Sequence, residues 1–177
     1  MNTMEKIINK LMMAKKMSAI YTDCDNSDTF HVGIILMKAS GWIMEYNIGT
    51  HGEYDGYSAE PIDGIYRLET ESSYLERLEK LSRGKGVKIK INTEGDDPII
   101  CLLRHAKENK KVVCIAVKED GNALTGFIDK YDDQVVFMTQ LDDMGRIDGK
   151  TVFYKNDIKR MNCDDVDCRD IEHLASM

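Results

Sequence analysis

The sequence predicts a mainly β protein with helices, in which two small five-stranded barrels follow one another and each is preceded by an α-helix. Two observations support this fold class. Short strand-like runs, separated by tight turns, follow each of two helical segments, which is a pattern typical of small barrels. In addition, the stretch GEYDGYS at residues 52–58 has a near copy, GRIDGKT, at residues 145–151.

The near copy belongs to a longer internal match. Residues 31–81 and 124–174, aligned at an offset of 93 without a gap, are identical at nine of 51 positions. The helical segments that precede them align at an offset of 92, with Ile8 beside Ile100. Because the order of elements also agrees, we expect an internal duplication. The identical positions are Gly33, Ile35, Gly52, Asp55, Gly56, Ile65, Arg67, Glu79 and Leu81, each with its counterpart 93 residues later.

The first repeat is expected at residues 1–82. Met4, Ile7, Ile8, Leu11 and Met12 recur at helical spacing and predict an amphipathic N-terminal helix. Strands are then predicted at residues 18–22, 31–38, 41–48 and 57–69, and a helix at residues 72–84 with Ser73 and Glu76 as a capping box.

Residues 83–97 are expected to form a basic strand and linker, and residues 98–177 the second repeat. The alternation in residues 87–91 predicts a half-exposed strand. Pro98 suits the first turn of a helix that Asp97 can cap. Further strands are predicted at residues 112–117, 124–131, 134–141 and 151–161, and a short helix at residues 165–174.

Residues 124–161 resemble the Sm-like (LSm) family, which includes bacterial RNA chaperones. Gly126 matches the family's glycine in the second strand, where a bent strand leaves no room for a side chain. Asp132 matches the aspartate at the turn into the third strand, and Lys155 matches a lysine of the second motif. The first repeat keeps Gly33 but has Ala39 at the aspartate position. The resemblance implies two tandem Sm-like (SH3-like) barrels.

The residues that would form the family's RNA pocket differ. The third-strand asparagine of many Sm proteins is Val136 here and Ile43 in the first repeat. The histidine that follows the lysine in the bacterial branch is Asn156 here and Asp63 in the first repeat. The resemblance therefore implies the fold without the usual base-binding side chains. It also implies a homo-oligomer that forms through barrel edge strands.

The charge distribution gives one candidate nucleic-acid surface. The formal net charge of −7 disfavours general binding to phosphates, but residues 83–111 carry an excess of Lys and Arg. A solvated linker whose lysines discourage edge pairing is the alternative. The candidate RNA-binding residues are Lys85, Lys88, Lys90, Arg104, Lys107, Lys155 and Asn156.

Tyrosines around the first repeated turn give a second candidate surface, for a protein partner. Packing of one barrel on the other is the alternative. The candidates are Tyr46, Tyr54, Tyr57 and Tyr66.

Catalytic and metal-binding patterns are not found in the sequence. It has no nucleophile elbow, no phosphate-binding glycine loop and no histidines at metal-ligand spacing. The five cysteines form no CxxC pair, and no secretory signal is visible, so we expect a cytoplasmic protein without cofactors or membrane contact. We expect a non-catalytic regulatory or scaffold module that binds a protein partner; the alternative is an RNA-binding protein. In both, the repeated Asp-Gly is expected to form a hairpin turn.

Overall fold

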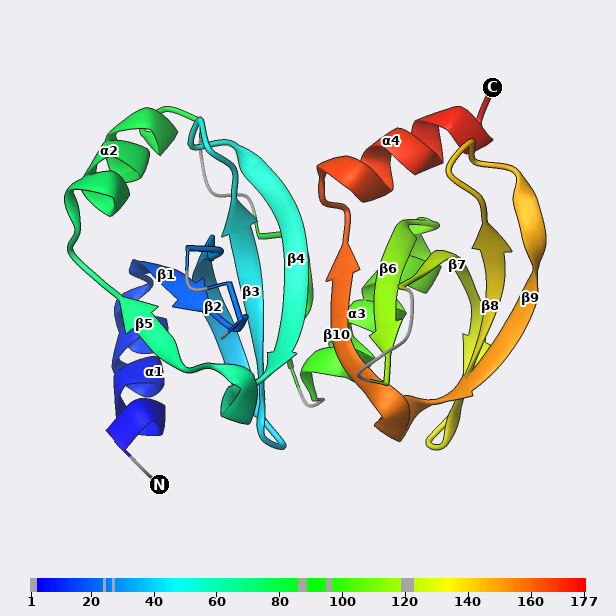
Figure 1. Ribbon diagram of the computed structural model, residues 1–177, viewed down its shortest axis with the longest axis horizontal. Coiled ribbons are helices and arrows are strands. Elements are labelled where there is room, and N and C mark those ends of the chain that lie inside the picture. The colour runs from blue at the N-terminus through cyan, green and yellow to red at the C-terminus, as the bar shows by residue number, and fades with distance from the viewer. Residues whose placement is uncertain (1–2, 24, 27, 86–88, 95–96, 119–122) are drawn as a thin grey trace. The chain divides into compact units, whose positions relative to one another are not determined.

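The computed structural model of the protein describes residues 3–23, 25–26, 28–85, 89–94, 97–118 and 123–177 (Figure 1). The chain divides into two compact units. Unit 1 comprises Met1–Asp55 and Glu60–Pro98, and unit 2 comprises Gly56–Ala59 and Ile99–Met177.

Unit 1 begins with a helix and continues into short strands. Its elements are α1 (Thr3–Ala14), β1 (Met17–Tyr21), β2 (His31–Ala39), β3 (Trp42–Ile48), β4 (Tyr54–Pro61), the 3-10 helix η1 (Ile62–Gly64), β5 (Arg67–Glu69) and α2 (Ser73–Ser82). The strand order is β5-β1-β2-β3-β4. The apolar face of α1 places Ile8 and Leu11 against Ile20, Ile35 and Ile43, so the predicted amphipathic helix closes the core of this unit.

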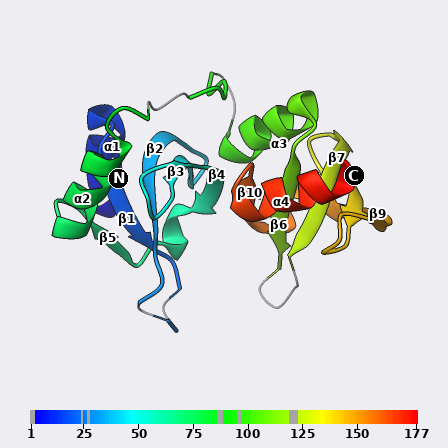
Figure 2. The ribbon, with the colours of Figure 1, turned by 90° about the horizontal axis from the view of Figure 1, so that it is seen from above.

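Unit 2 has the same order of elements. They are α3 (Pro98–Asn109), β6 (Val112–Val117), β7 (Leu124–Tyr131), β8 (Val135–Leu141), β9 (Ile147–Tyr154), η2 (Lys155–Asp157), β10 (Ile158–Cys163) and α4 (Val166–Ala175). Residues Tyr57–Ala59 of β4 pair with β10, and the order continues β10-β6-β7-β8-β9. Figure 2 shows α4 crossing β6, where Cys168 packs with Val112 and Leu141.

Strand registers agree between the units at the expected offset. Gly33 lies opposite Asn47, and Gly126 lies opposite Gln140. A register shift follows Ile35 in β2 and Ile128 in β7, so the bend in the two strands falls at corresponding positions. The helices, however, correspond at an offset of 95 and not 92, because α1 begins at Thr3 and α3 at Pro98. The loop between the first two strands is therefore longer in unit 1.

The repeated G-x-x-D-G segment has two parts with different roles. Gly52 and Gly145 close the turns that lead into β4 and β9, and each has a positive φ. The Asp-Gly that follows was predicted to form the hairpin turn, and this prediction is wrong. Gly56 and Gly149 lie inside the strands, and a register shift between β8 and β9 falls at Gly149. Glycine with positive φ suits such a bulge as well as it suits a turn.

The mainly β class with helices is confirmed, but the strands form an open sheet and not closed barrels. The two terminal strands are β5 and β9. In unit 2 the physical reason is clear, because β10 pairs with β6 along one edge and with residues of β4 along the other. No edge of β10 remains for β9. Within the described residues, no helix is long and apolar enough to cross a membrane.

Two local predictions also need correction. The strand predicted at residues 87–91 is not present at Ile89–Ile91, and residues 87–88 lie outside the described part of the chain. The cap of α2 is Ser72 and not Ser73, since the Ser72 hydroxyl accepts a hydrogen bond from the Leu75 amide. By contrast, Pro98 does begin α3.

Candidate interaction site

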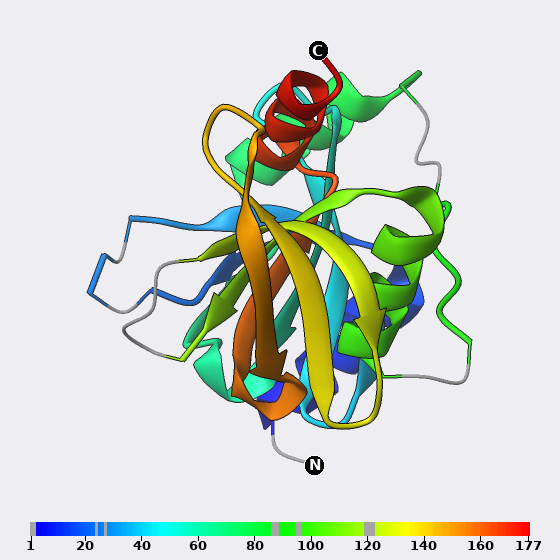
Figure 3. The same ribbon diagram turned by 90° about the vertical axis from the view of Figure 1, so that its right-hand side faces the viewer.

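Strand β9 forms one open edge of the sheet. Its pairing with β8 begins where Ile147 lies opposite Leu141 and ends where Tyr154 lies opposite Val135. It has no second neighbour among the described strands (Figure 3). An unpaired edge presents a row of backbone N–H and C=O groups that can pair with another extended chain. β9 is therefore the backbone surface in unit 2 that is best suited to binding a further strand.

The exposed face of β9 carries apolar side chains. Val152 is 54% exposed and Tyr154 is 64% exposed. The residue of β4 that corresponds to Val152 is Ala59, which is fully buried, and it lies in the part of β4 that pairs with β10. The same strand position is thus covered where a neighbouring strand is present and uncovered at β9.

Charged residues on the same strand limit indiscriminate pairing. Asp148 and Lys150 are exposed at the start of β9, and the Lys150 ammonium lies 3.9 Å from an Asp129 carboxylate oxygen. Charges on an edge strand, lysine above all, oppose aggregation with arbitrary strands. An edge with both charged and apolar side chains favours partners that complement both.

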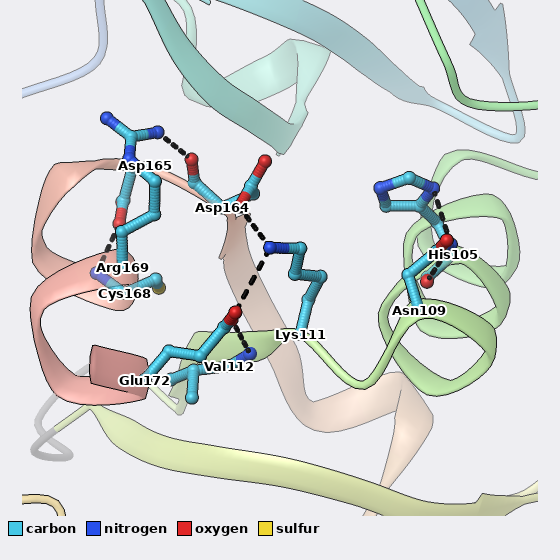
Figure 4. Close-up of polar contacts among 9 residues, drawn as sticks. All are labelled: His105, Asn109, Lys111, Val112, Asp164, Asp165, Cys168, Arg169 and Glu172. Atoms are coloured by element: carbon cyan, nitrogen blue, oxygen red, sulfur yellow. Dashed lines mark hydrogen bonds and ion pairs between the residues drawn. The ribbon is translucent and has the colours of Figure 1, made fainter. Parts of the chain in front are cut away.

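A second cluster of polar residues in unit 2 joins β6 to α4 (Figure 4). The Lys111 ammonium lies 3.1 Å from an Asp164 oxygen and 3.1 Å from a Glu172 oxygen, and the second Glu172 oxygen accepts a hydrogen bond from the Val112 amide. Burial lowers the pKa of Lys111, but the hydrogen bonds and charges of the two carboxylates outweigh it, so the net shift is upward.

This ion-pair network has a counterpart in unit 1, where Lys16 lies 2.9 Å from Glu71. Lys16 precedes β1 as Lys111 precedes β6, and Glu71 precedes α2 as Asp164 precedes α4. Glu71 and Asp164 both have a positive φ. Because both units contain the same pair at the same junction, we assign it to holding the last helix on the first strand and not to a ligand site.

The N-terminus of α4 is organised by neighbouring side chains (Figure 4). The Asp165 carboxylate accepts a hydrogen bond of 2.8 Å from the Cys168 amide, and Arg169 donates to the Asp164 carbonyl oxygen. Burial raises the pKa of the Cys168 thiol, as it does for Cys163. A thiol that stays protonated is a poor nucleophile, so neither cysteine is a candidate catalytic group.

The candidate RNA-binding residues are distributed over both units. Lys85 and Lys90 belong to unit 1 and are exposed, and the Lys85 ammonium donates a hydrogen bond of 2.6 Å to the His51 carbonyl. Lys88 lies outside the described residues.

The remaining candidates belong to unit 2. In α3, Arg104 is half-buried and donates to the Cys101 sulfur, and Lys107 lies over the Tyr131 ring at 5.9 Å. Lys155 and Asn156 lie in η2, where the Lys155 amide donates to the Gln134 carbonyl oxygen. Within unit 2 these residues therefore lie on two separate elements.

Two of the candidate contact tyrosines are buried. Tyr57 is 1% exposed and packs edge-on against His105 in unit 2, and Tyr46 is buried beside Tyr54. Tyr66 is exposed and lies edge-on to Tyr21. The four tyrosines therefore do not form one exposed patch.

Asp132, which the resemblance placed at the turn into the third strand, has a defined local role. Its carboxylate accepts hydrogen bonds of 2.8 Å from the amides of Gln134 and Val135 at the start of β8. These backbone hydrogen bonds lower the pKa of Asp132. The aspartate thus stabilises the turn.

No family model, curated protein or solved structure matches the chain. Within the part of the chain that the structure describes, no group of three or more His, Cys, Asp or Glu side chains is placed to hold a metal ion. Sequence reasoning did not identify the β9 edge. Val152 and Tyr154 alternate with Thr151 and Phe153, and this alternation identifies a strand but not its missing neighbour.

Proposed function

We propose that the protein is a non-catalytic scaffold module that binds a protein partner by adding an extended strand of that partner to β9. The supporting observation is the uncovered edge of β9, with Val152 and Tyr154 exposed on it. Strand addition derives affinity from backbone hydrogen bonds and selectivity from alternate side chains. Both requirements are met by this edge.

The pairing of β10 with β4 supplies a template for this interaction. Ala59 lies opposite Met161, Ser58 opposite Asn162 and Tyr57 opposite Cys163. β9 corresponds to β4, and β5 corresponds to β10, in the tandem Sm-like arrangement that this proposal includes. Ala59 of β4 corresponds to Val152 of β9, and Met161 of β10 corresponds to Leu68 of β5. The same pairing between two chains would therefore place Val152 of one chain opposite Leu68 of a second copy.

A second copy is therefore the first partner to test. β5 of unit 1 pairs with β1 and is the other terminal strand. A contact between β9 of one chain and β5 of the next joins two different surfaces and generates rings or filaments. Any other protein that presents an extended strand of similar chemistry would use the same edge.

The test is self-association of purified protein, measured by light scattering over a concentration series. We expect association in the wild type, at least about tenfold weaker association in Val152→Glu because a charge would be buried in the new pair, and no change in Met13→Lys. Met13 is a matched control, since it is an exposed apolar residue on α1. A strictly monomeric wild type at high concentration would exclude the second copy. Equal capture of proteins from cells by wild type and Val152→Glu would then exclude β9 as the binding edge.

RNA binding is the second candidate function. The excess of Lys and Arg in residues 83–111 and the exposed Lys90, Lys107 and Asn156 favour it. Titration with a mixed RNA pool at two salt concentrations tests it, because phosphate contacts weaken as salt rises. Salt-dependent binding that is lost in the combined Lys85→Glu, Lys88→Glu and Lys90→Glu variant would support it. Binding that is absent at low salt would reject it.

A further inference from the structure

Unit 1 contains a buried cluster of one histidine and two glutamates. The His31 Nε2 atom, at the start of β2, lies 3.0 Å from a Glu45 oxygen in β3 and 3.1 Å from a Glu60 oxygen in β4. The Glu45 and Glu60 side chains are 0% and 2% exposed, and the His31 side chain is 20% exposed. The imidazole is therefore the member of the cluster that reaches solvent.

The cluster holds at least one shared proton. An ionised carboxylate accepts hydrogen bonds but donates none, so the 3.0 Å hydrogen bond between His31 Nε2 and Glu45 requires a proton on one of these two groups. Two negative groups beside one imidazole also favour its doubly protonated, cationic form. Transfer of carboxylates out of water is costly unless such a cation and its hydrogen bonds accompany them.

The corresponding positions of unit 2 show that this topology does not need polar groups here. His31, Glu45 and Glu60 correspond to Leu124, Met138 and Phe153 at the repeat offset. Met138 and Phe153 are buried in the core of unit 2. Unit 2 thus fills with apolar side chains the space that unit 1 fills with titratable ones.

The strands around the ring contribute few other polar groups. β1 places Ile20 opposite His31, and the neighbouring Ser18, which is fully buried, lies opposite Gly33. The Ser18 hydroxyl makes no hydrogen bond within the described residues. β3 contributes Glu45 and Asn47 to the same face, β4 contributes Glu60, and the loop before β2 carries the exposed Asp23, Asp25 and Asp28. The titratable groups described in contact with the ring are the carboxylates of Glu45 and Glu60.

We propose that this cluster, which we call the His31–Glu45–Glu60 triad, makes unit 1 a proton-linked switch. The folded unit holds the imidazolium between the two carboxylates, whereas the unfolded chain exposes all three groups to water. The folded state then binds more protons than the unfolded state around neutral pH, so its stability falls as pH rises. The loss of stability occurs in the pH range where histidine titrates. The unfolding that it favours involves the strands β2, β3 and β4 that carry the triad.

The experiment follows urea unfolding of the full-length chain by tryptophan fluorescence at several pH values. Trp42 is the single tryptophan and lies in β3, so the signal reports on unit 1. We expect the folding equilibrium constant to fall by about tenfold or more between about pH 5.5 and pH 8. His51→Gln removes an exposed histidine of the same unit and should leave this pH dependence unchanged.

The decisive variant replaces the triad with its unit 2 counterparts, as His31→Leu, Glu45→Met and Glu60→Phe together. It fills the three positions with apolar side chains, and we expect it to remove the pH dependence of the unfolding transition that Trp42 reports. A pH dependence equal to that of the wild type would overturn the proposal. If this variant does not fold, NMR titration of the wild-type His31 ring decides. A titration midpoint for His31 above that of His51 supports the proposal, and a midpoint at or below that of His51 overturns the proposal.

Discussion

Replacing Gly52 with alanine is expected to destabilise unit 1 far more than replacing Gly41 with alanine. Both glycines lie in turns of unit 1 with nearly equal backbone angles, φ +77° and +80°. A Cβ atom at Gly52 would lie 2.7 Å from the Ser82 nitrogen and 2.9 Å from the Leu81 carbonyl carbon, whereas a Cβ atom at Gly41 would have no heavy atom within 4 Å. The pair therefore separates backbone strain from crowding.

The two costs can be assigned from this geometry. A left-handed backbone costs an alanine about 1–2 kcal/mol, and both variants bear this cost. The crowded atoms at Gly52 belong to the backbone of α2 and cannot rotate away, so a shift of the helix adds about 1–3 kcal/mol. We therefore expect a loss of about 1–2 kcal/mol for Gly41→Ala and about 2–5 kcal/mol for Gly52→Ala.

Urea unfolding followed by the fluorescence of Trp42 measures both losses in the same unit. The hydrogen bond from the Gly52 amide to the Gly49 carbonyl oxygen remains available to alanine, so its loss does not complicate the comparison. Equal destabilisation by the two variants would refute the reasoning, because it would mean that α2 does not pack on this turn in solution.

Three further predictions concern unit 2. Lys111→Met should cost about 1–2 kcal/mol in urea unfolding followed by circular dichroism, since it removes the cation that the half-buried Asp164 and Glu172 carboxylates share. Lys16→Met removes the corresponding pair of unit 1 and should cost less, because that pair is exposed to solvent. Asp165→Ala should cost about 1 kcal/mol by removing the cap of α4, and an unchanged urea midpoint would contradict the capping role. Cys163 and Cys168 should react with a thiol reagent only after unfolding, because burial keeps them protonated; rapid labelling of these two cysteines in the native protein would show that the core opens.

The sequence was sufficient to predict most elements, because their signals are local. Pro98 marks the start of α3, and hydrophobic periodicity identifies the strands that begin at Val112 and Leu124. The role of the Asp-Gly pairs was not predictable in the same way. A glycine with positive φ suits a hairpin turn and a bulge equally well, and the difference at Gly149 depends on its pairing with β8. Closure of the barrels likewise depends on which edges pair, which no local pattern records.

The candidate surfaces were less predictable, because exposure depends on the neighbouring strands. Tyr57 and Lys150 occupy corresponding positions of β4 and β9, yet Tyr57 is buried beside β10 and Lys150 is exposed. Glutamates are usually exposed, and nothing in the local sequence around Glu45 indicates otherwise. Only the register, which brings Glu45 to the same face as Ile35, places it inside unit 1.

Comparison of the two units separates what the fold requires from what a function could require. Features present in both, such as the Lys111 ion pair and the glycine at Gly145, hold the last helix on its unit and need no ligand to explain them. The triad around His31 differs, because the same position in unit 2 is apolar. A buried ionic cluster seldom stabilises a fold more than the apolar residues that could replace it. Its presence in only one of two units that share a topology is therefore explained better by the response to protons than by packing, and the swap of the triad for its unit 2 counterparts tests both explanations at once. A more stable variant that has lost its pH dependence would establish that unit 1 gives up stability for that response.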